Sequence, residues 1–274
     1  MFQLRLLNCH RHVGSHYPHH RFRHRQPVCG SDEGDHFGDN PAARVTDISH
    51  EIPPQDVRHA AIVLAESTPW FPAGTIHVAV VDPGVGTARR LIYAHLGDQH
   101  YLAPDNGVFS LLAKRNRPIR IIEVANAEYW LPEVSHTFHG RDILAPVAAQ
   151  LSLGLEPERL GPALPQIQTL DWPDPVVTDS GIEGAVRWID RFGNLITNIT
   201  ASMLAPGRSA GGLTIDCAGR EIAGLSDCYG QHPPGTLAGL VGSSGYLEIA
   251  VAESSAARML EATVGTPVAV RWQP

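Results

Sequence analysis

The pattern of apolar residues changes once along this chain of 274 residues, and the change divides it into two parts. Residues 42–165 alternate between segments with helical apolar spacing and short β-branched runs, which is typical of an α/β layered domain. Residues 166–180 are rich in Pro, Asp and Thr and lack periodicity, which favours a linker. Short strands punctuated by glycine follow, and they favour a small antiparallel barrel or sandwich. We therefore expect an N-terminal α/β domain over 40–165 and a C-terminal β-barrel domain over 181–274.

The same patterns predict individual elements in each part. The expected helices are Pro54–Glu66, Val108–Arg115 and Asp142–Leu151. The expected strands of the first domain are Ile76–Val81 and Ile119–Val124, and those of the second are Ala185–Asp190, Leu195–Ile199, Leu213–Cys217, Tyr246–Val251 and Val268–Trp272. The run Ile76–Val81 is largely apolar and β-branched, which is typical of a strand buried in a parallel sheet.

Charge, hydropathy and cysteine usage exclude several classes of protein. A net charge of −7 argues against a general nucleic-acid-binding protein. No apolar run approaches the roughly 20 residues that span a bilayer, so we expect no membrane segment. The N-terminus lacks the features of a secretory signal, and the four cysteines form no CxxC pair. These observations favour reduced thiols and a cytoplasmic location.

Two loops carry residues suited to hydrolysis. The run VVDPGVGTARR at residues 80–90 places Asp82 just after a predicted strand, with Arg89 seven residues later, and TFHGRD at residues 137–142 contributes His139. Ligands bind beyond the carboxyl ends of strands in open α/β sheets, and a carboxylate, a guanidinium and an imidazole together can polarise one water molecule. Each motif also has a structural explanation, because Asp-Pro-Gly is common turn chemistry and a single histidine is often structural.

Two further motifs lie in the second domain. The run WIDRFGN at residues 188–194 contains Asp190, Phe192 and Asn194. These residues suit either the polar rim of a ligand-binding site, with Phe192 as a stacking ring, or an ordinary hairpin turn. The run GSSGYLE at residues 242–248 could hold a carboxylate through hydroxyl and backbone N–H groups, although most such loops are turns.

Taken together and in order, these motifs resemble the S-adenosylmethionine (SAM) hydroxide adenosyltransferase family, whose relatives are the SAM-dependent fluorinases and chlorinases. Similar stretches also occur at residues 47–56 and 103–107, and the resemblance extends from Asn40 to about Trp272. The resemblance implies a Rossmann-like N-terminal domain, a C-terminal β-barrel and a homotrimer in which SAM lies between the first domain of one subunit and the second domain of its neighbour.

The resemblance also implies roles for residues of this chain. The water-activating triad falls on Asp82, Arg89 and His139. Substrate-binding positions fall on Asp190, Phe192, Asn194, Ser243, Ser244 and Glu248, with Phe192 as an adenine-stacking residue. The implied reaction is hydrolysis of SAM to adenosine and L-methionine by water attacking the ribose 5′ carbon, with no metal and no cofactor beyond the substrate.

Two alternatives remain open from the sequence. A SAM-dependent halogenase of the same fold would need a dehydrated halide, and an anionic Asp82, where fluorinases carry Tyr, disfavours one. The other is an inactive homologue whose His-rich N-terminus binds metal, since residues 1–39 hold seven of the 15 histidines.

Residues 1–39 match none of the family's N-terminal motifs. Read one base later, a back-translation of residues 20–34 recovers the family's Thr-Asp-Phe-Gly and Tyr-Val-Gly-Val-Met-Lys-Gly motifs. We therefore interpret residues 1–39 as an out-of-frame segment that replaces the first core strand, the first helix and a ribose-binding Asp.

Overall fold

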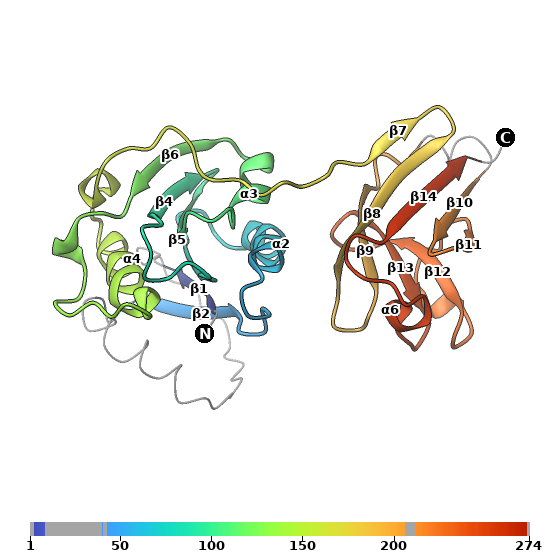
Figure 1. The fold of residues 1–274 in the computed structure, drawn as a ribbon, viewed down its shortest axis with the longest axis horizontal. Helices are drawn as coiled ribbons and strands as arrows, with labels where there is room; N and C mark the ends of the chain where they lie inside the picture. The colour runs from blue at the N-terminus through green and yellow to red at the C-terminus, as the bar shows by residue number, and fades with distance from the viewer. Residues whose placement is uncertain (1–2, 9–39, 41–42, 206–211, 273–274) are drawn as a thin grey trace. The chain divides into compact units, whose positions relative to one another are not determined.

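The computed structural model describes residues 3–8, 40, 43–205 and 212–272, and over them the chain forms two compact units (Figure 1). The units are Met1–Asp171 and Trp172–Pro274. The first is a mixed α/β unit, and the second is a nearly closed β-barrel. The range 166–180, expected to be a linker, includes the end of the first unit and the short strand β7 (Val176–Thr178) of the second.

The first unit is built on a six-stranded sheet in the order β2-β1-β3-β5-β4-β6. Its strands are β1 (Gln3–Asn8), β2 (Arg44–Ser49), β3 (Ile76–Val80), β4 (Leu91–Leu96), β5 (Gln99–Pro104) and β6 (Pro118–Glu123). β3 and β5 are parallel, whereas β1 and β4 run antiparallel to their neighbours. The sheet is therefore mixed rather than parallel, because β1 runs against both of its neighbours and because β4 and β5 form a hairpin that the sequence patterns did not predict.

The strand β1 occupies the place that we expected to lack a core strand. Leu4 pairs with Ser49 of β2 on one side and with Ala79 of β3 on the other. The carboxyl ends of β2 and β3 consequently lie at the same edge of the sheet. The expectation that the N-terminal stretch supplies no strand here is thus wrong for Gln3–Asn8. The rest of the interpretation of residues 1–39, as out of frame or as a metal-binding extension, concerns residues outside the described ranges.

Helices cover both faces of this sheet. The α-helices are α2 (Val57–Ser67), α3 (Ser110–Arg115) and α4 (Ala145–Ser152), and Figure 1 shows α2 and α4 on opposite sides of the strands. Shorter helices are η1 (Thr68–Trp70), η2 (Ala127–Tyr129), the π-helical η3 (Gly140–Leu144) and η4 (Pro157–Leu160). The α2 helix begins three residues later than expected because Asp56 caps it, accepting a hydrogen bond from the His59 backbone N–H.

The core of the first unit lies between the sheet and η3–α4. It contains Ile76 and Val78 of β3 together with Val147 and Ala148 of α4, all at most 5% exposed. Strand side chains alternate between the two faces of a sheet, so residues two apart on β3 lie on the same face. Ile76 and Val78 therefore both pack against the facing helix. This packing fixes the start of η3–α4 against the end of β3.

The second unit is an antiparallel sheet that curls almost into a barrel. Its path is β11-β10-β14-β8-β9-β13-β12, with β7 added beside β8. The strands are β8 (Gly181–Ile189), β9 (Leu195–Thr200), β10 (Leu213–Cys217), β11 (Arg220–Ala223), β12 (Leu237–Val241), β13 (Tyr246–Val251) and β14 (Pro267–Trp272), and the short helices are η5 (Tyr229–Gln231) and α6 (Ala256–Met259). A bridge between Ser226 and Leu240 brings the two ends of the path together. The bounds of β10 and β13 are those that the sequence predicted.

Candidate functional site

The first candidate loop leaves the sheet at the end of β3 and returns to it at the start of β4. Because β4 is antiparallel to β5, its first residue Leu91 pairs with Pro104, the last residue of β5. Residues 81–90 therefore lie beyond the edge at which β3 and β5 end. Two interactions hold the loop there: Asn106 Nδ2 donates to the Val81 carbonyl at 2.8 Å, and Arg90 pairs with the buried Asp105 at 2.6 Å.

His139 reaches the same edge from the start of the π-helix η3. The sequence predicted a helix beginning at Asp142, but Asp142 lies inside η3 and accepts a hydrogen bond from the Ser135 backbone N–H at 2.7 Å. His139 instead occupies the N-terminal capping position of η3. A single π-helical turn is rare and is often found at functional sites, because it shifts one side chain relative to an α-helical register.

Gly140 explains how His139 comes so close to β3. A Cβ atom at position 140 would lie 2.8 Å from Val80 Cγ1, which is too close for any side chain. The second loop is packed against the first in the same way, because a Cβ at Gly86 would lie 2.6 Å from the His136 carbonyl oxygen, and Gly86 has a φ of 79°. The two loops thus meet through positions that only glycine can occupy.

Replacing Gly140 with alanine is expected to displace η3 from β3. The added methyl group meets a β-branched side chain that cannot turn away, so we expect a loss of about 1–3 kcal/mol of stability and a clear loss of activity. Thermal unfolding and kcat are to be measured for G140A and for the double variant V80A/G140A, in which the clash is removed.

Gly230 provides the matched control for G140A, because its φ is not positive and a Cβ there would meet nothing within 4 Å. G230A should unfold at the wild-type temperature. A G140A protein with wild-type stability and activity would show that the close approach of Gly140 to Val80 does not position the histidine.

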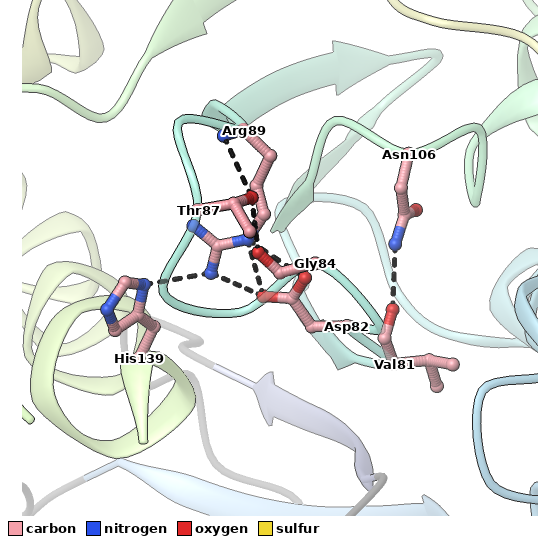
Figure 2. A network of polar contacts seen from close by, with 7 residues as sticks. All are labelled: Val81, Asp82, Gly84, Thr87, Arg89, Asn106 and His139. Carbon is pink, nitrogen blue, oxygen red and sulfur yellow. Dashed lines mark hydrogen bonds and ion pairs between the residues drawn. The ribbon is translucent and has the colours of Figure 1, made fainter. Parts of the chain in front are cut away.

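The structure brings Asp82, Arg89 and His139 together, as Figure 2 shows. Arg89 Nε lies 2.9 and 2.7 Å from the two carboxylate oxygens of Asp82, and Arg89 Nη2 also donates to Asp82 Oδ2. The same Nη2 lies 2.8 Å from His139 Nδ1. The arginine is therefore the central member of the cluster, with the carboxylate on one side and the imidazole on the other.

This geometry determines which nitrogen of His139 is basic. A guanidinium can only donate, so His139 Nδ1 accepts from Arg89 and carries no proton, and the proton of the neutral ring is on Nε2. Burial, and then the positive charge of Arg89, lower the pKa of His139 below its ordinary value of 6.5. The imidazole is consequently neutral at pH 7 and presents an unprotonated acceptor beside the guanidinium.

Burial makes the Asp82–Arg89 pair strong. The two side chains are 10% and 11% exposed, and they form a two-pronged contact of the kind that fixes both orientation and charge. The carboxylate charge is compensated by the guanidinium. The repulsion of anions that we expected from Asp82 alone is therefore weaker than the sequence suggested.

A cavity of about 540 Å³ lies in the second unit and contains three of the predicted binding residues. Asp190, Phe192 and Asn194 line it. Asp190 Oδ1 accepts from the backbone N–H groups of Phe192 and Asn194, and its Oδ2 accepts from Asn194 Nδ2 at 2.9 Å. These contacts fix the hairpin between β8 and β9 and leave the Phe192 ring 73% exposed.

The remaining predicted residues do not line this cavity. Ser243 is exposed and Ser244 half-buried in the turn between β12 and β13, and Glu248 is buried on β13. The residues that line the cavity but were not predicted from the sequence are Tyr229, Val251, Glu253, Ser254 and Arg258. They were missed because they come from η5, from the end of β13, from the turn that follows it and from α6, and no short motif links these segments.

Two further searches of the described ranges gave negative results. Neither unit has a group of three or more His, Cys, Asp or Glu side chains within those ranges that could hold a metal ion. Over the same residues, no helix is both long and apolar enough to cross a bilayer.

Comparisons with known proteins agree with the order of the motifs. The family model for the SAM hydroxide adenosyltransferase N-terminal domain matches residues 22–161, and that for the C-terminal domain matches residues 184–269. The first match begins inside the stretch 1–39, which we expected to share no motif with the family.

Individual relatives agree with the family models. The chain is 42% identical over 236 residues to an (R)-S-adenosyl-L-methionine hydrolase of Thermus thermophilus, with 83% of this chain and 88% of the relative covered. A fluorinase of Actinoplanes is 27% identical over 186 residues, or 58% of this chain and 62% of the relative. A solved structure from Thermotoga maritima, described as an uncharacterized conserved protein, is 34% identical with a TM-score of 0.84 over 90% of this chain and 96% of that one.

Proposed function

Because the chain belongs to the SAM hydroxide adenosyltransferase family, we propose that it hydrolyses SAM to adenosine and L-methionine. A water oxygen attacks the ribose 5′ carbon while the bond from that carbon to sulfur breaks. The bonding electron pair stays on sulfur, which leaves as the neutral thioether of methionine, so no acid is needed for the leaving group. The water's proton must pass to a base, and the observation that carries the proposal is a neutral His139 beside Arg89 and Asp82.

The three side chains supply what the attacking water needs. His139 Nδ1 accepts a proton once the water takes the place of the Arg89 contact. The Arg89 guanidinium stabilises the hydroxide character that develops on the oxygen, and Asp82 holds the guanidinium by its two-pronged contact. The cluster carries no net charge before reaction, because one carboxylate balances one guanidinium.

The same geometry favours water over a halide as nucleophile. A water molecule can donate to His139 Nδ1 and to Asp82 while accepting from Arg89. A halide ion can only accept hydrogen bonds, so the lone pair of His139 Nδ1 would face the lone pairs of the halide. The halogenase alternative is therefore disfavoured by hydrogen-bond complementarity more than by the charge of Asp82, which Arg89 compensates.

The substrate-binding roles extend this proposal to the second unit. Asp190 and Asn194 contact the methionine amine and the nucleoside, and Phe192 stacks on adenine, which is supported by their common cavity. The hydroxyls of Ser243 and Ser244, with nearby backbone N–H groups, hold the methionine carboxylate.

We propose a homotrimer because the catalytic cluster and the cavity lie in different units. In this arrangement SAM binds between the first unit of one subunit and the second unit of its neighbour. Sedimentation should give three times the mass of one chain. Inactive H139A and D190A proteins should regain activity when mixed under conditions of subunit exchange, and a failure to complement would contradict shared sites.

The sulfonium configuration of the substrate is a finer part of the proposal. The name of the Thermus relative contains the prefix (R). The letter L already gives the configuration of the amino-acid carbon, and the word adenosyl gives that of the sugar. The prefix therefore describes the configuration at the sulfur atom. We extend this configuration to the present chain. Each sulfonium epimer should be supplied separately, and faster consumption of the (S) epimer would refute the assignment.

The proposal also includes the fold type of the first unit and the location of the protein in the cell. A Rossmann-like first unit is supported by the four strands β2, β3, β5 and β6, which share one direction and end at the edge that bears the cluster. A cytoplasmic location is supported by the free thiols of Cys217 and Cys228.

The pH dependence of hydrolysis is expected to follow His139. The imidazole must be neutral to accept a proton, and its pKa lies below 6.5, so kcat/KM should fall to half of its plateau value only at a pH below 6.5. Removing the charge of Arg89 in an R89M variant should raise the pKa of His139, because Asp82 and Asp142 remain beside it. Histidine NMR titration of both proteins measures this shift, and a lower pKa in R89M would contradict the arrangement.

The proposed reaction is tested by incubating the full chain with SAM in ¹⁸O-labelled water, with and without chloride or fluoride. We expect adenosine carrying the label at its 5′ oxygen, together with methionine. A halogenated nucleoside would establish the halogenase alternative, and unchanged SAM would refute both activities.

A further inference from the structure

The cavity of the second unit has one wall that is tied to a buried carboxylate. Tyr229 lines the cavity together with Phe192, and its hydroxyl donates to Glu248 Oε1 at 2.5 Å. Glu248 is 7% exposed and does not itself line the cavity. The carboxylate therefore contacts the hydroxyl end of the tyrosine without itself lining the cavity.

Burial of this carboxylate is costly and needs a compensating partner. Burial raises the pKa of Glu248, the hydrogen bond from Tyr229 lowers it, and the nearby charge of Asp190 raises it further. A buried carboxylate without a hydrogen-bond donor would be strongly destabilising. The Tyr229 hydroxyl is the side-chain donor that meets this need, so the two residues depend on each other.

Glu248 also contacts the turn that carries Ser243. A Cβ atom at Gly242 would lie 2.5 Å from Glu248 Oε2, so this oxygen packs directly against the first residue of the turn. One carboxylate thus touches two segments far apart in the sequence, η5 with Tyr229 and the turn after β12. Both segments border the region that our proposed function assigns to SAM.

Tyr229 has few other restraints within the described contacts. It begins the three-residue helix η5, and its ring is 44% exposed. Fixing an exposed aromatic ring costs conformational entropy, and a ligand that must order the ring on binding has a correspondingly lower affinity. A strong hydrogen bond that holds the ring in advance would therefore improve ligand binding.

We propose that Glu248 is a positioning residue, which acts through Tyr229 rather than by touching the substrate. It fixes the phenol ring as a second aromatic wall beside Phe192, so that the cavity accepts a flat heteroaromatic ring. The inference rests on the proposed function in taking that ring to be the adenine of SAM. It replaces the direct substrate contact that the sequence resemblance implied for Glu248.

Four variants of the full chain test this role: Y229F, E248Q, E248L and the double variant Y229F/E248L. KM and kcat for SAM are to be measured, with the dissociation constant of adenosine from calorimetry. Y229F and E248L should each raise KM about 5- to 20-fold, because each removes the same hydrogen bond to a charged group. The value of kcat should change less than about twofold, because the catalytic cluster is untouched. E248Q keeps an acceptor oxygen and should raise KM less than about threefold.

The double variant separates positioning from direct contact. Y229F/E248L should have the KM of Y229F alone, since the second substitution removes nothing further. Additive effects, or an E248Q protein as impaired as E248L, would overturn the inference. If E248L does not fold, the double variant Y229F/E248Q gives the same comparison. Tyr246, which stacks on Arg187 outside the cavity lining, supplies the control Y246F, with wild-type KM.

The adenosine measurement distinguishes this inference from the proposed function. A wild-type protein that binds adenosine, with weaker binding in Y229F and E248L, but releases none from SAM would refute the hydrolase and leave the aromatic wall supported. Hydrolysis with unchanged KM in all four variants would overturn the positioning role alone. A wild-type protein that does neither would refute both.

Discussion

Replacement of His139 by alanine is expected to lower kcat for adenosine formation by about 10²- to 10⁴-fold, the usual contribution of a general base. The imidazole presents its unprotonated Nδ1 2.8 Å from Arg89 Nη2, at the place where an attacking water would be held. Asp82 cannot take its place as the proton acceptor, because a carboxylate is a weaker base than an imidazole. KM for SAM should change little, since substrate contacts are proposed in the second unit.

The control for H139A is His136, three residues earlier in the same loop. Its side chain is exposed, and its charge is the smallest of the influences on the pKa of His139, so H136A should keep kcat within about twofold of the wild type. Equal losses in H139A and H136A would indicate a disturbed loop rather than a lost base. Wild-type kcat in H139A would refute the assignment of His139.

Replacement of Asp82 by asparagine is expected to lower kcat by about 10²- to 10³-fold, in the range found when one electrostatic contact to a developing charge is lost. Asparagine keeps the shape but removes the negative charge, so the guanidinium loses its two-pronged partner and can reorient. Removal of this charge should also lower the pKa of His139 further, because Asp82 raises it. The remaining activity of D82N should therefore persist to lower pH than that of the wild type.

Asp98 provides the matched control for D82N. It is an exposed aspartate of the β4–β5 hairpin, and D98N should have wild-type kcat. D82N also tests nucleophile choice, since it should form no halogenated nucleoside when His139 Nδ1 still presents an acceptor. Formation of such a product by D82N would show that the carboxylate alone excludes halide.

Parts of the fold were predictable because local patterns dictate them. The bounds of β10 and β13 match those expected, and β3 differs by one residue. β3 and β13 are largely buried and apolar, β10 alternates buried with half-buried residues, and a glycine shortly precedes each strand, which are patterns that predict strands well. The hairpin β4–β5 was missed because His95, Gln99 and His100 interrupt the apolar run that would mark strands.

For the candidate site, the sequence predicted the catalytic residues but not their arrangement. Asp82, Arg89 and His139 were identified because each lies in a short motif beside a regular element. Their order, with Arg89 in the centre, depends on contacts across fifty residues and could not be read from the motifs. Tyr229 was missed for the same reason, since its partner Glu248 lies on another strand.

The amino-acid sequence by itself determined which chemical groups the protein has and which short segments carry them, because turn residues and apolar periodicity act over a few neighbours. The tertiary structure alone decided strand direction, the π-helical turn that presents His139, and the nitrogen of that ring that is basic. These properties arise from close approach between distant segments, such as Gly140 against Val80 and Arg89 between two partners. Hydrogen bonding and steric contact act over a few ångströms in space, so they are fixed only when the chain has folded.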